Sequence, residues 1–392
     1  MNQQSYARSD LSQFNEAQLS FPEHSTRSDL LHMQRLKYMF QQRDNALNRW
    51  HTLFATVFVA VCLLPRAAAA EKPQLGINYN WYQLKADQIS ECASHPARVL
   101  WGGGVVQQYN DPKIREAVRG QLAEMHNAGF VSMRIILHAS QLPQDHKEGL
   151  IHTVTGDISI EDQGNIRNFV TDVSAAGFRS LEVAFGFQGE GKLFCKKNDW
   201  GDCFDPGRTD PNWRFIDSST ALVKSAAQSM SLRFDLNNEG CVSPSMPAAT
   251  IAHTKTYLAT IVSRFREKYG DNEWLISCPD SRKGDRLKAL LEGLHESNLR
   301  PKFVEIHTYK EDPDHVRDVI AAANDMAAQI GAKVILGELR YHSDVQEKVI
   351  HDFIRNQPNN RIVDILQWPH ASDSKCPIDV QPPYDLGLYG KD

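Results

Sequence analysis

Two short stretches of the sequence each place a glutamate after a strand-like run of apolar residues. Residues 232–240 (LRFDLNNEG) contain Glu239, and residues 333–341 (KVILGELRY) contain Glu338. Carboxyl groups that meet at one site can act as an acid, a base or a nucleophile, depending on which of them holds a proton. The two stretches therefore predict a two-carboxylate enzyme, provided that one fold brings both strand ends to the same place.

The rest of the chain has the pattern of such a fold, because short apolar runs alternate with longer amphipathic segments from residue 71 onward. We expect strands at 75–80, 131–138, 180–187, 232–238, 273–278, 303–308, 334–338 and 362–368. We expect helices between them at 114–128, 166–176, 215–229, 250–268, 286–295, 316–330 and 345–355. Eight strands alternating with helices are typical of an α/β protein with a (β/α)8 TIM barrel, here a single catalytic domain with loop insertions. An open, doubly wound sheet is the alternative, although it more often begins with a glycine-rich turn.

Polar and aromatic residues gather in the expected strands and at their carboxyl ends, where the active site of a TIM barrel lies. Besides the two glutamates, these positions supply Arg134, Asn238, His307, Tyr309 and Trp368. Several strands also carry a charged residue in mid-run, namely Arg134, Glu182, Arg233, Asp235, Glu305 and Asp364. Charges inside a barrel are tolerated when they are paired. We therefore expect a partly buried ion network beneath the active site.

This set of residues resembles the one found in the clan A retaining glycoside hydrolases, which include the family 5 cellulases and mannanases and many β-glycosidases. The resemblance covers the whole expected barrel in order. It implies that Glu239 is the acid/base residue, that Glu338 is the nucleophile, and that Asn238 holds the 2-hydroxyl group of the sugar. The activity it implies is the hydrolysis of β-glycosidic bonds in an oligo- or polysaccharide, with retention of the anomeric configuration.

The resemblance also implies roles for the surrounding side chains. His307 and Tyr309 would orient the carboxylates, and Trp368 would form the floor of the subsite for the non-reducing sugar. Retention requires a protonated acid and an ionised nucleophile about 5–5.5 Å apart. Two carboxyl groups at that distance raise one pKa, which would supply the acid, and Arg134 beneath Glu338 would keep the nucleophile ionised.

The N-terminal part of the sequence differs in composition from the expected barrel. Residues 1–50 are polar and are interpreted as a disordered extension or as a start placed too far upstream. Residues 51–70 contain an apolar run, Leu53–Leu64, between basic residues and an alanine run that ends at Ala70. That order predicts a secretory signal peptide cleaved near Ala70, because the run is shorter than the roughly 20 residues of a membrane span. The mature protein would be secreted or periplasmic, without a membrane span, and would consist of residues 71–392; an uncleaved N-terminal anchor is the alternative.

Six cysteines follow the expected cleavage site, and an even number in an exported chain suggests disulfides. In a closed barrel, cysteines that share a loop or follow neighbouring strands lie close together. On that basis we expect the pairs Cys195–Cys203, Cys241–Cys278 and Cys92–Cys376. Free buried thiols are the alternative.

Composition limits the remaining possibilities. The chain has 392 residues and a net charge of −5 without a basic block, which argues against nucleic acid as a partner. A two-carboxylate mechanism requires no metal and no organic cofactor, and we expect a monomer. Two rival interpretations are a barrel that binds glycan without cleaving it and a metal-dependent hydrolase that uses His138, His307 and Asp280. The first strand contains no His-x-His pair, which argues against the second rival.

Overall fold

The computed structural model describes residues 72–80, 106, 108–140, 150–187, 206–340, 343–357, 359–368 and 382–387. The chain divides into two units, Met1–Ala69 and Ala70–Asp392, and every described residue belongs to the second unit. The polar extension expected at 1–50 and the signal peptide expected at 51–70 lie outside the described residues. Among the described helices, none combines the length and apolar character that a membrane crossing requires.

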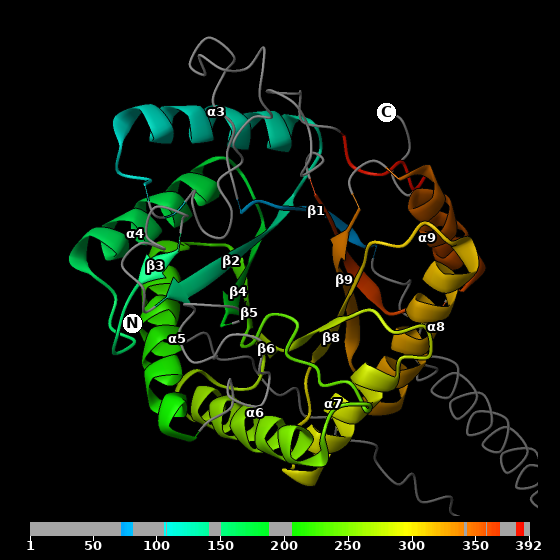
Figure 1. Ribbon diagram of the computed structural model, residues 1–392. Helices are drawn as coiled ribbons and strands as arrows, with labels where there is room; N and C mark the ends of the chain where they lie inside the picture. Colours follow the sequence, from blue (N-terminus) through cyan, green and yellow to red (C-terminus); the bar gives the residue numbers. More distant parts are fainter. Residues whose placement is uncertain are drawn as a thin grey trace, which may run out of the picture. The chain divides into compact units, whose positions relative to one another are not determined.

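The described strands form one parallel sheet that closes on itself. The barrel strands are β1 (Gln74–Asn78), β2 (Ser132–Ser140), β4 (Ser180–Gly186), β5 (Ser231–Asp235), β6 (Trp274–Leu275), β7 (Ser277–Pro279), β8 (Phe303–Thr308), β9 (Lys333–Leu339) and β10 (Ile362–Gln367). Hydrogen bonds join them in the order β6-β5-β4-β2-β1-β10-β9-β8-β7, and the short β3 (Ile151–His152) pairs with the end of β2. The two ends of this order, β6 and β7, are separated in the chain only by Ile276. Together they act as one strand and close an eight-stranded barrel (Figure 1).

Seven helices of the described chain surround the barrel, as Figure 1 shows. They are α3 (Pro112–Asn127), α4 (Ile160–Ala175), α5 (Pro206–Ala226), α6 (Ala248–Tyr269), α7 (Asp285–Glu296), α8 (Pro313–Ile330) and α9 (Asp344–Asn356). Each lies between two barrel strands in the sequence, so that strands and helices alternate. The expected α/β class and (β/α)8 fold are therefore confirmed, although α4 and α5 begin several residues earlier than expected.

Residues at the helix ends explain where the chain turns between helix and strand. Asp111 precedes α3 and Asp312 precedes α8, and the side chain of each accepts hydrogen bonds from backbone N–H groups of the first turn. A proline follows each aspartate and fits the first helical position, where its missing N–H group is not needed. Gly331 ends α8 with a φ angle of +75°, a left-handed conformation that glycine adopts without strain, and β9 begins two residues later.

Two strand ends differ from the expectation, and both lie beside the candidate site. The strand expected at 232–238 ends at Asp235, because the chain turns at Asn237, whose carbonyl oxygen accepts a bond of 2.8 Å from the N–H group of Gly240. The strand expected at 273–278 is interrupted at Ile276. As a result, Glu239 lies in a turn after β5 rather than at the end of a continuous strand.

The inward face of the barrel carries both apolar and charged side chains. Most buried apolar residues form one large cluster, whereas Leu275, Ile335 and Leu366 form a separate, fully buried cluster. Ile335 is in register with Glu305 on one side and with Asp364 on the other. Residues in register on parallel strands point to the same face of the sheet. The small apolar cluster and the buried charges therefore share the interior of the barrel.

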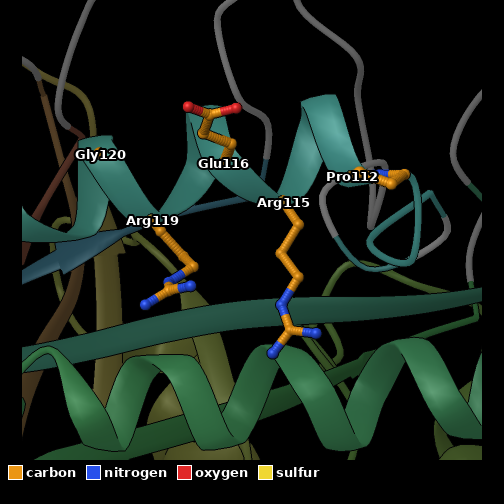
Figure 2. A pocket seen from close by; sticks show the side chains of 5 residues that line it. All are labelled: Pro112, Arg115, Glu116, Arg119 and Gly120. Atoms are coloured by element: carbon orange, nitrogen blue, oxygen red, sulfur yellow. The ribbon is translucent and has the colours of Figure 1, made fainter.

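An open hollow lies on the surface at α3 and shares no residue with the candidate site (Figure 2). Its lining consists of Pro112, Arg115, Glu116, Arg119 and Gly120. In Figure 2, Arg115 and Arg119 point from α3 towards the neighbouring helix, and Nε of Arg115 lies 2.8 Å from a carboxylate oxygen of Asp172 in α4. Arg115 thus joins two helices of the outer ring.

Two glycine-to-alanine substitutions should change stability in opposite directions. A Cβ atom on Gly76 in β1 would lie 2.2 Å from Cδ2 of Leu366 and 2.8 Å from Cβ of Ser132, so Gly76→Ala should lower the free energy of unfolding by about 1–3 kcal/mol. Gly120 in α3 has open space at this position, so Gly120→Ala should raise it by about 1 kcal/mol. Urea unfolding measures both, and equal effects would contradict the close packing of β1.

Candidate active site

A buried guanidinium group, that of Arg134 in β2, joins the side chains expected at the site. Its Nη1 donates to Oε1 of Glu338 at 2.7 Å, and its Nη2 donates to Oδ1 of Asn238 at 2.6 Å. Arg134 is fully buried, as is most of Glu338 at the end of β9. The structure therefore places Arg134 against the expected nucleophile and against the residue that precedes the expected acid/base.

The second oxygen of Glu338 is bound by Tyr309, which Trp368 contacts in turn. The hydroxyl group of Tyr309 donates to Oε2 of Glu338, and Nε1 of Trp368 donates to the Tyr309 hydroxyl oxygen at 2.9 Å. Burial and the neighbouring Glu338 carboxylate raise the pKa of Tyr309, so its proton stays in place as a donor. As a whole residue, Tyr309 is 44% exposed, so part of it remains accessible.

His307 in β8 contacts both expected catalytic carboxylates through one ring nitrogen. Its Nδ1 lies 3.3 Å from Oε1 of Glu239 and 3.5 Å from Oε1 of Glu338. The separation of those two oxygens cannot exceed the sum of these distances. This upper limit on the separation of the two carboxylate oxygens lies near the lower end of the roughly 6.5–9.5 Å between the carboxyl groups of inverting enzymes. It is compatible with the roughly 5–5.5 Å between those of retaining enzymes.

The surroundings of His307 favour its protonated form. Burial lowers the pKa of His307, but the charge of Glu338 and the bonds to Glu239 and Glu305 outweigh it and raise the pKa to about 10. Burial raises the pKa of Glu239, but the hydrogen bond and charge of His307 outweigh it and lower the pKa. We expected the neighbouring carboxylate to raise the pKa of Glu239, and that expectation is wrong here because a histidine cation lies between the two glutamates.

Beneath the site, the expected ion network is present and almost fully buried. Arg134 contacts Glu182 through Nε at 2.7 Å, Glu305 through Nε at 3.1 Å and Asp235 through Nη2 at 3.2 Å. Arg233 in β5 continues the network, with Nε 3.4 Å from Glu182 and Nη1 2.8 Å from Oδ2 of Asp364 in β10. All six charged residues that the sequence indicated therefore belong to one cluster.

Carboxylates outnumber guanidinium groups in this cluster, and burial raises the pKa of Glu305 above neutrality. Burial and the charge of Glu182 raise the pKa of Glu305 to about 8, in spite of Arg134. The charges of Arg134 and Arg233 outweigh burial at Glu182 and lower its pKa. Oε1 of Glu305 lies 2.9 Å from Nε2 of His307, so the network connects directly to the pair of catalytic candidates.

Two polar residues complete the site and were not singled out from the sequence. Asn78 at the end of β1 donates through Nδ2 to the carbonyl oxygen of Gly337 at 2.9 Å, and its Oδ1 lies 3.4 Å from Nη1 of Arg134. Ser277 at the start of β7 accepts a bond of 2.7 Å from the backbone N–H group of Glu239. Asn78 could have been found from the sequence, because it is a polar residue at the end of a strand, as Asn238 was expected to be. No feature of the sequence around Ser277 indicates a role at the site.

One expected disulfide is confirmed next to these residues. Cys241, after β5, is bonded to Cys278 in β7, and both are buried. The neighbouring positions of β5 and of the β6–β7 strand bring the two cysteines together, as expected. The pairs Cys195–Cys203 and Cys92–Cys376 lie outside the described residues.

The residues of the metal-dependent rival do not meet. A Cβ atom on Gly186 would lie 1.9 Å from Nδ1 of His138, so His138 packs closely against β4. Oδ2 of Asp280 accepts from Thr308 at 2.8 Å and lies 3.1 Å from Nε2 of His315. In the part of the chain that the structure describes, no three His, Cys, Asp or Glu side chains are placed to hold a metal ion.

Removing one charge from the network should destabilise the barrel far more than removing a surface charge. Asp235→Asn withdraws a carboxylate that Arg134 and Ser277 contact, and loss of one partner from a buried pair costs about 3–5 kcal/mol. The matched control is Asp210→Asn, whose own side chain is 70% exposed in its ion pair with Arg264, and it should leave the melting temperature almost unchanged. Similar melting temperatures for the two variants would contradict a network that supports the fold.

The raised pKa of His307 predicts a pH dependence of stability. The ordinary value is 6.5 and the folded value is about 10, so the folded protein binds this proton more tightly than the unfolded chain does. The stabilisation is complete below pH 6.5 and is lost as the pH rises through about 10. His307→Gln should therefore flatten the decline in unfolding free energy over this range, whereas the exposed His253→Gln should preserve it. An unchanged slope in the His307 variant would refute the assignment.

Comparisons with known proteins agree with this architecture. No family model and no curated protein matches the sequence. Among solved structures, a GH5-4 broad specificity endoglucanase from Clostridium acetobutylicum aligns with a TM-score of 0.50 and 12% identity, over 80% of this chain and 95% of that chain. A β-mannanase from the blue mussel Mytilus edulis aligns with a TM-score of 0.49 and 10% identity, over 72% of this chain and 86% of that chain. The resemblance to clan A glycoside hydrolases is thus confirmed at the level of the fold: the chain is a (β/α)8 barrel of the kind found in the endoglucanase.

Proposed function

We propose that the protein is a retaining glycoside hydrolase that cleaves β-glycosidic bonds of an oligo- or polysaccharide. The observation that carries this proposal is the shared contact of Glu239 and Glu338 with Nδ1 of His307, which holds two carboxylates close together at the carboxyl ends of the strands. The barrel fold of a broad specificity endoglucanase, which the chain shares, supports the same reaction class.

Glu338 is the nucleophile in this proposal. Arg134 and Tyr309 each bind one of its oxygens, which fixes the carboxylate and stabilises its charge. In the first step a Glu338 oxygen attacks the anomeric carbon, the bond to the leaving oxygen breaks, and a covalent glycosyl-enzyme forms. Asn238, which Arg134 holds through Oδ1, lies next to Glu239 and would hold the 2-hydroxyl group of the sugar. Trp368 would form the floor of the subsite for the non-reducing sugar.

Glu239 is the acid/base, and its proton comes from the pair that it forms with His307. The two side chains lie 3.3 Å apart and together hold one proton in the ligand-free protein. A proton shared by such a pair belongs to both groups and can move to Glu239 when the substrate displaces water. Glu239 then donates it to the leaving oxygen. In the second step Glu239 accepts a proton from water, whose oxygen attacks the anomeric carbon and releases Glu338.

The protein is exported in this proposal, and residues 51–70 are its cleavable signal peptide. The disulfide between Cys241 and Cys278 supports an oxidising compartment, because disulfides are rare in the cytosol. Residues 71–392 would then be the mature protein and a single catalytic domain. Detection of the mature N-terminus near Ala70 in the extracellular or periplasmic fraction would support export.

Replacement of the two glutamates should produce different defects. Glu338→Gln should abolish turnover of every glycoside, because it removes the nucleophile. Glu239→Ala should lower kcat/KM about 10²–10⁴-fold for substrates with poor leaving groups, but much less for glycosides of acidic phenols, which leave without a proton. Azide should restore breakdown of the intermediate in Glu239→Ala and yield a β-glycosyl azide. A panel of fluorogenic β-glycosides and polysaccharides identifies the substrate on which these rates are measured.

A matched control variant and the configuration of the first product test the proposed mechanism. Glu296→Gln, on the exposed end of α7, makes the same chemical change as Glu338→Gln and should leave turnover intact. A first product of inverted configuration, observed by NMR, would refute the double-displacement mechanism. Saturable glycan binding without turnover of any substrate would instead identify a binding protein on the same barrel.

A further inference from the structure

The backbone of Glu239 has a conformation that a non-glycine residue rarely adopts. Its φ angle is +54°, in the left-handed region, and β5 ends four residues earlier at Asp235. Residues persist in this region only where the surrounding structure determines their conformation. Since Glu239 lies beyond the last residue of β5, other contacts must hold the carboxyl group in position.

Ser277 of β7 supplies the first of these contacts. Its Oγ accepts the backbone N–H bond of Glu239 at 2.7 Å and donates to Oδ2 of Asp235 at 2.6 Å. The backbone N–H group of Ser277 also donates to Oδ1 of Asp235 at 3.0 Å. Because the Ser277 hydroxyl group donates its hydrogen bond to Asp235, a lone pair of its oxygen remains available to accept the N–H group of Glu239. The network that Arg134 organises thus extends through Asp235 and Ser277 to the backbone of the acid/base.

The disulfide supplies the second contact, and it joins the same two segments. Cys241 lies two residues after Glu239, and Cys278 lies one residue after Ser277. Their Cα atoms are 5.0 Å apart, and their side chains are only 2% and 1% exposed. The covalent bond therefore prevents the turn that contains Glu239 from moving away from β7.

We propose that β7 positions the acid/base through a two-point clamp, formed by the Ser277 hydroxyl and the Cys241–Cys278 disulfide. This inference rests on the proposed function of Glu239. The nucleophile does not depend on the clamp, because Glu338 is held by Arg134 and Tyr309. Loss of either point of the clamp should therefore impair proton transfer at Glu239 while the nucleophilic attack persists. Ser277 and the disulfide are positioning elements, since neither touches the reacting atoms.

The dependence on the leaving group distinguishes this clamp from a general structural role. In the full chain, Ser277→Ala and the double variant Cys241→Ala/Cys278→Ala should each lower kcat/KM about 10–100-fold for alkyl glycosides or oligosaccharides. The same variants should change kcat/KM less than threefold for dinitrophenyl glycosides, because that leaving group needs no proton. Ser219→Ala, which removes an equally buried hydroxyl group from α5, should affect neither substrate. Equal losses on both substrates, or no loss on either, would overturn the clamp.

A second measurement tests the clamp without any turnover. His307 owes part of its raised pKa to Glu239, so displacement of Glu239 should lower the pKa that NMR of labelled histidine reports in Ser277→Ala or in the double variant. An unchanged pKa of His307 would overturn the clamp. If one of the two variants fails to fold, the other still provides this measurement. If the wild-type protein cleaves no glycoside but the titration shifts as expected, the proposed function fails and the clamp stands.

Discussion

The buried charge of Arg134 is the constraint on which the rest of the barrel interior depends. A guanidinium group that is fully removed from water is tolerated only when carboxylates and other acceptors surround it. β4, β5, β8 and β9 each contribute one carboxylate to it. The position of Glu305 beside Arg134 also restricts the side chain at residue 337 in β9, since a Cβ atom on Gly337 would lie 1.7 Å from Oε1 of Glu305. The residues that four strands place beside Arg134, and the size of the side chain allowed at residue 337, thus depend on one cation.

The same cluster determines where protons lie at the site. Burial and the charge of Glu182 raise the pKa of Glu305 to about 8, and the charge of Glu338 with the bonds to Glu239 and Glu305 raises that of His307 to about 10 in spite of burial. His307 lies between the buried network and the carboxylates of Glu239 and Glu338, and its Nδ1 is within 3.5 Å of an oxygen of each. In the proposed mechanism, the supply of a proton to Glu239 therefore depends on the buried network as well as on His307.

The two catalytic candidates are held by different physical means. Side chains bind both oxygens of Glu338, so its carboxylate is fixed directly. The carboxyl group of Glu239 contacts His307, but its backbone depends on the hydrogen bond that its N–H group donates to Ser277 and on a nearby disulfide. Because of this difference, we expect mutation of Ser277 or reduction of the disulfide to displace Glu239 while Glu338 keeps its geometry. Both glutamates nevertheless connect to Arg134. Glu338 contacts it directly, and Glu239 is linked to it through Ser277 and Asp235.

Local sequence determined the barrel, the positions of both glutamates and the membership of the ion network. Alternation along a strand and amphipathic spacing along a helix are short-range patterns, and the order of strands then predicted that Cys241 would meet Cys278. Tertiary structure alone decided the early end of β5, the left-handed backbone of Glu239 and the role of Ser277. It also reversed the expected pKa shift of Glu239. A pKa depends on distances to charges such as those of His307 and Arg134, which are remote in the sequence, and the folded barrel alone sets those distances.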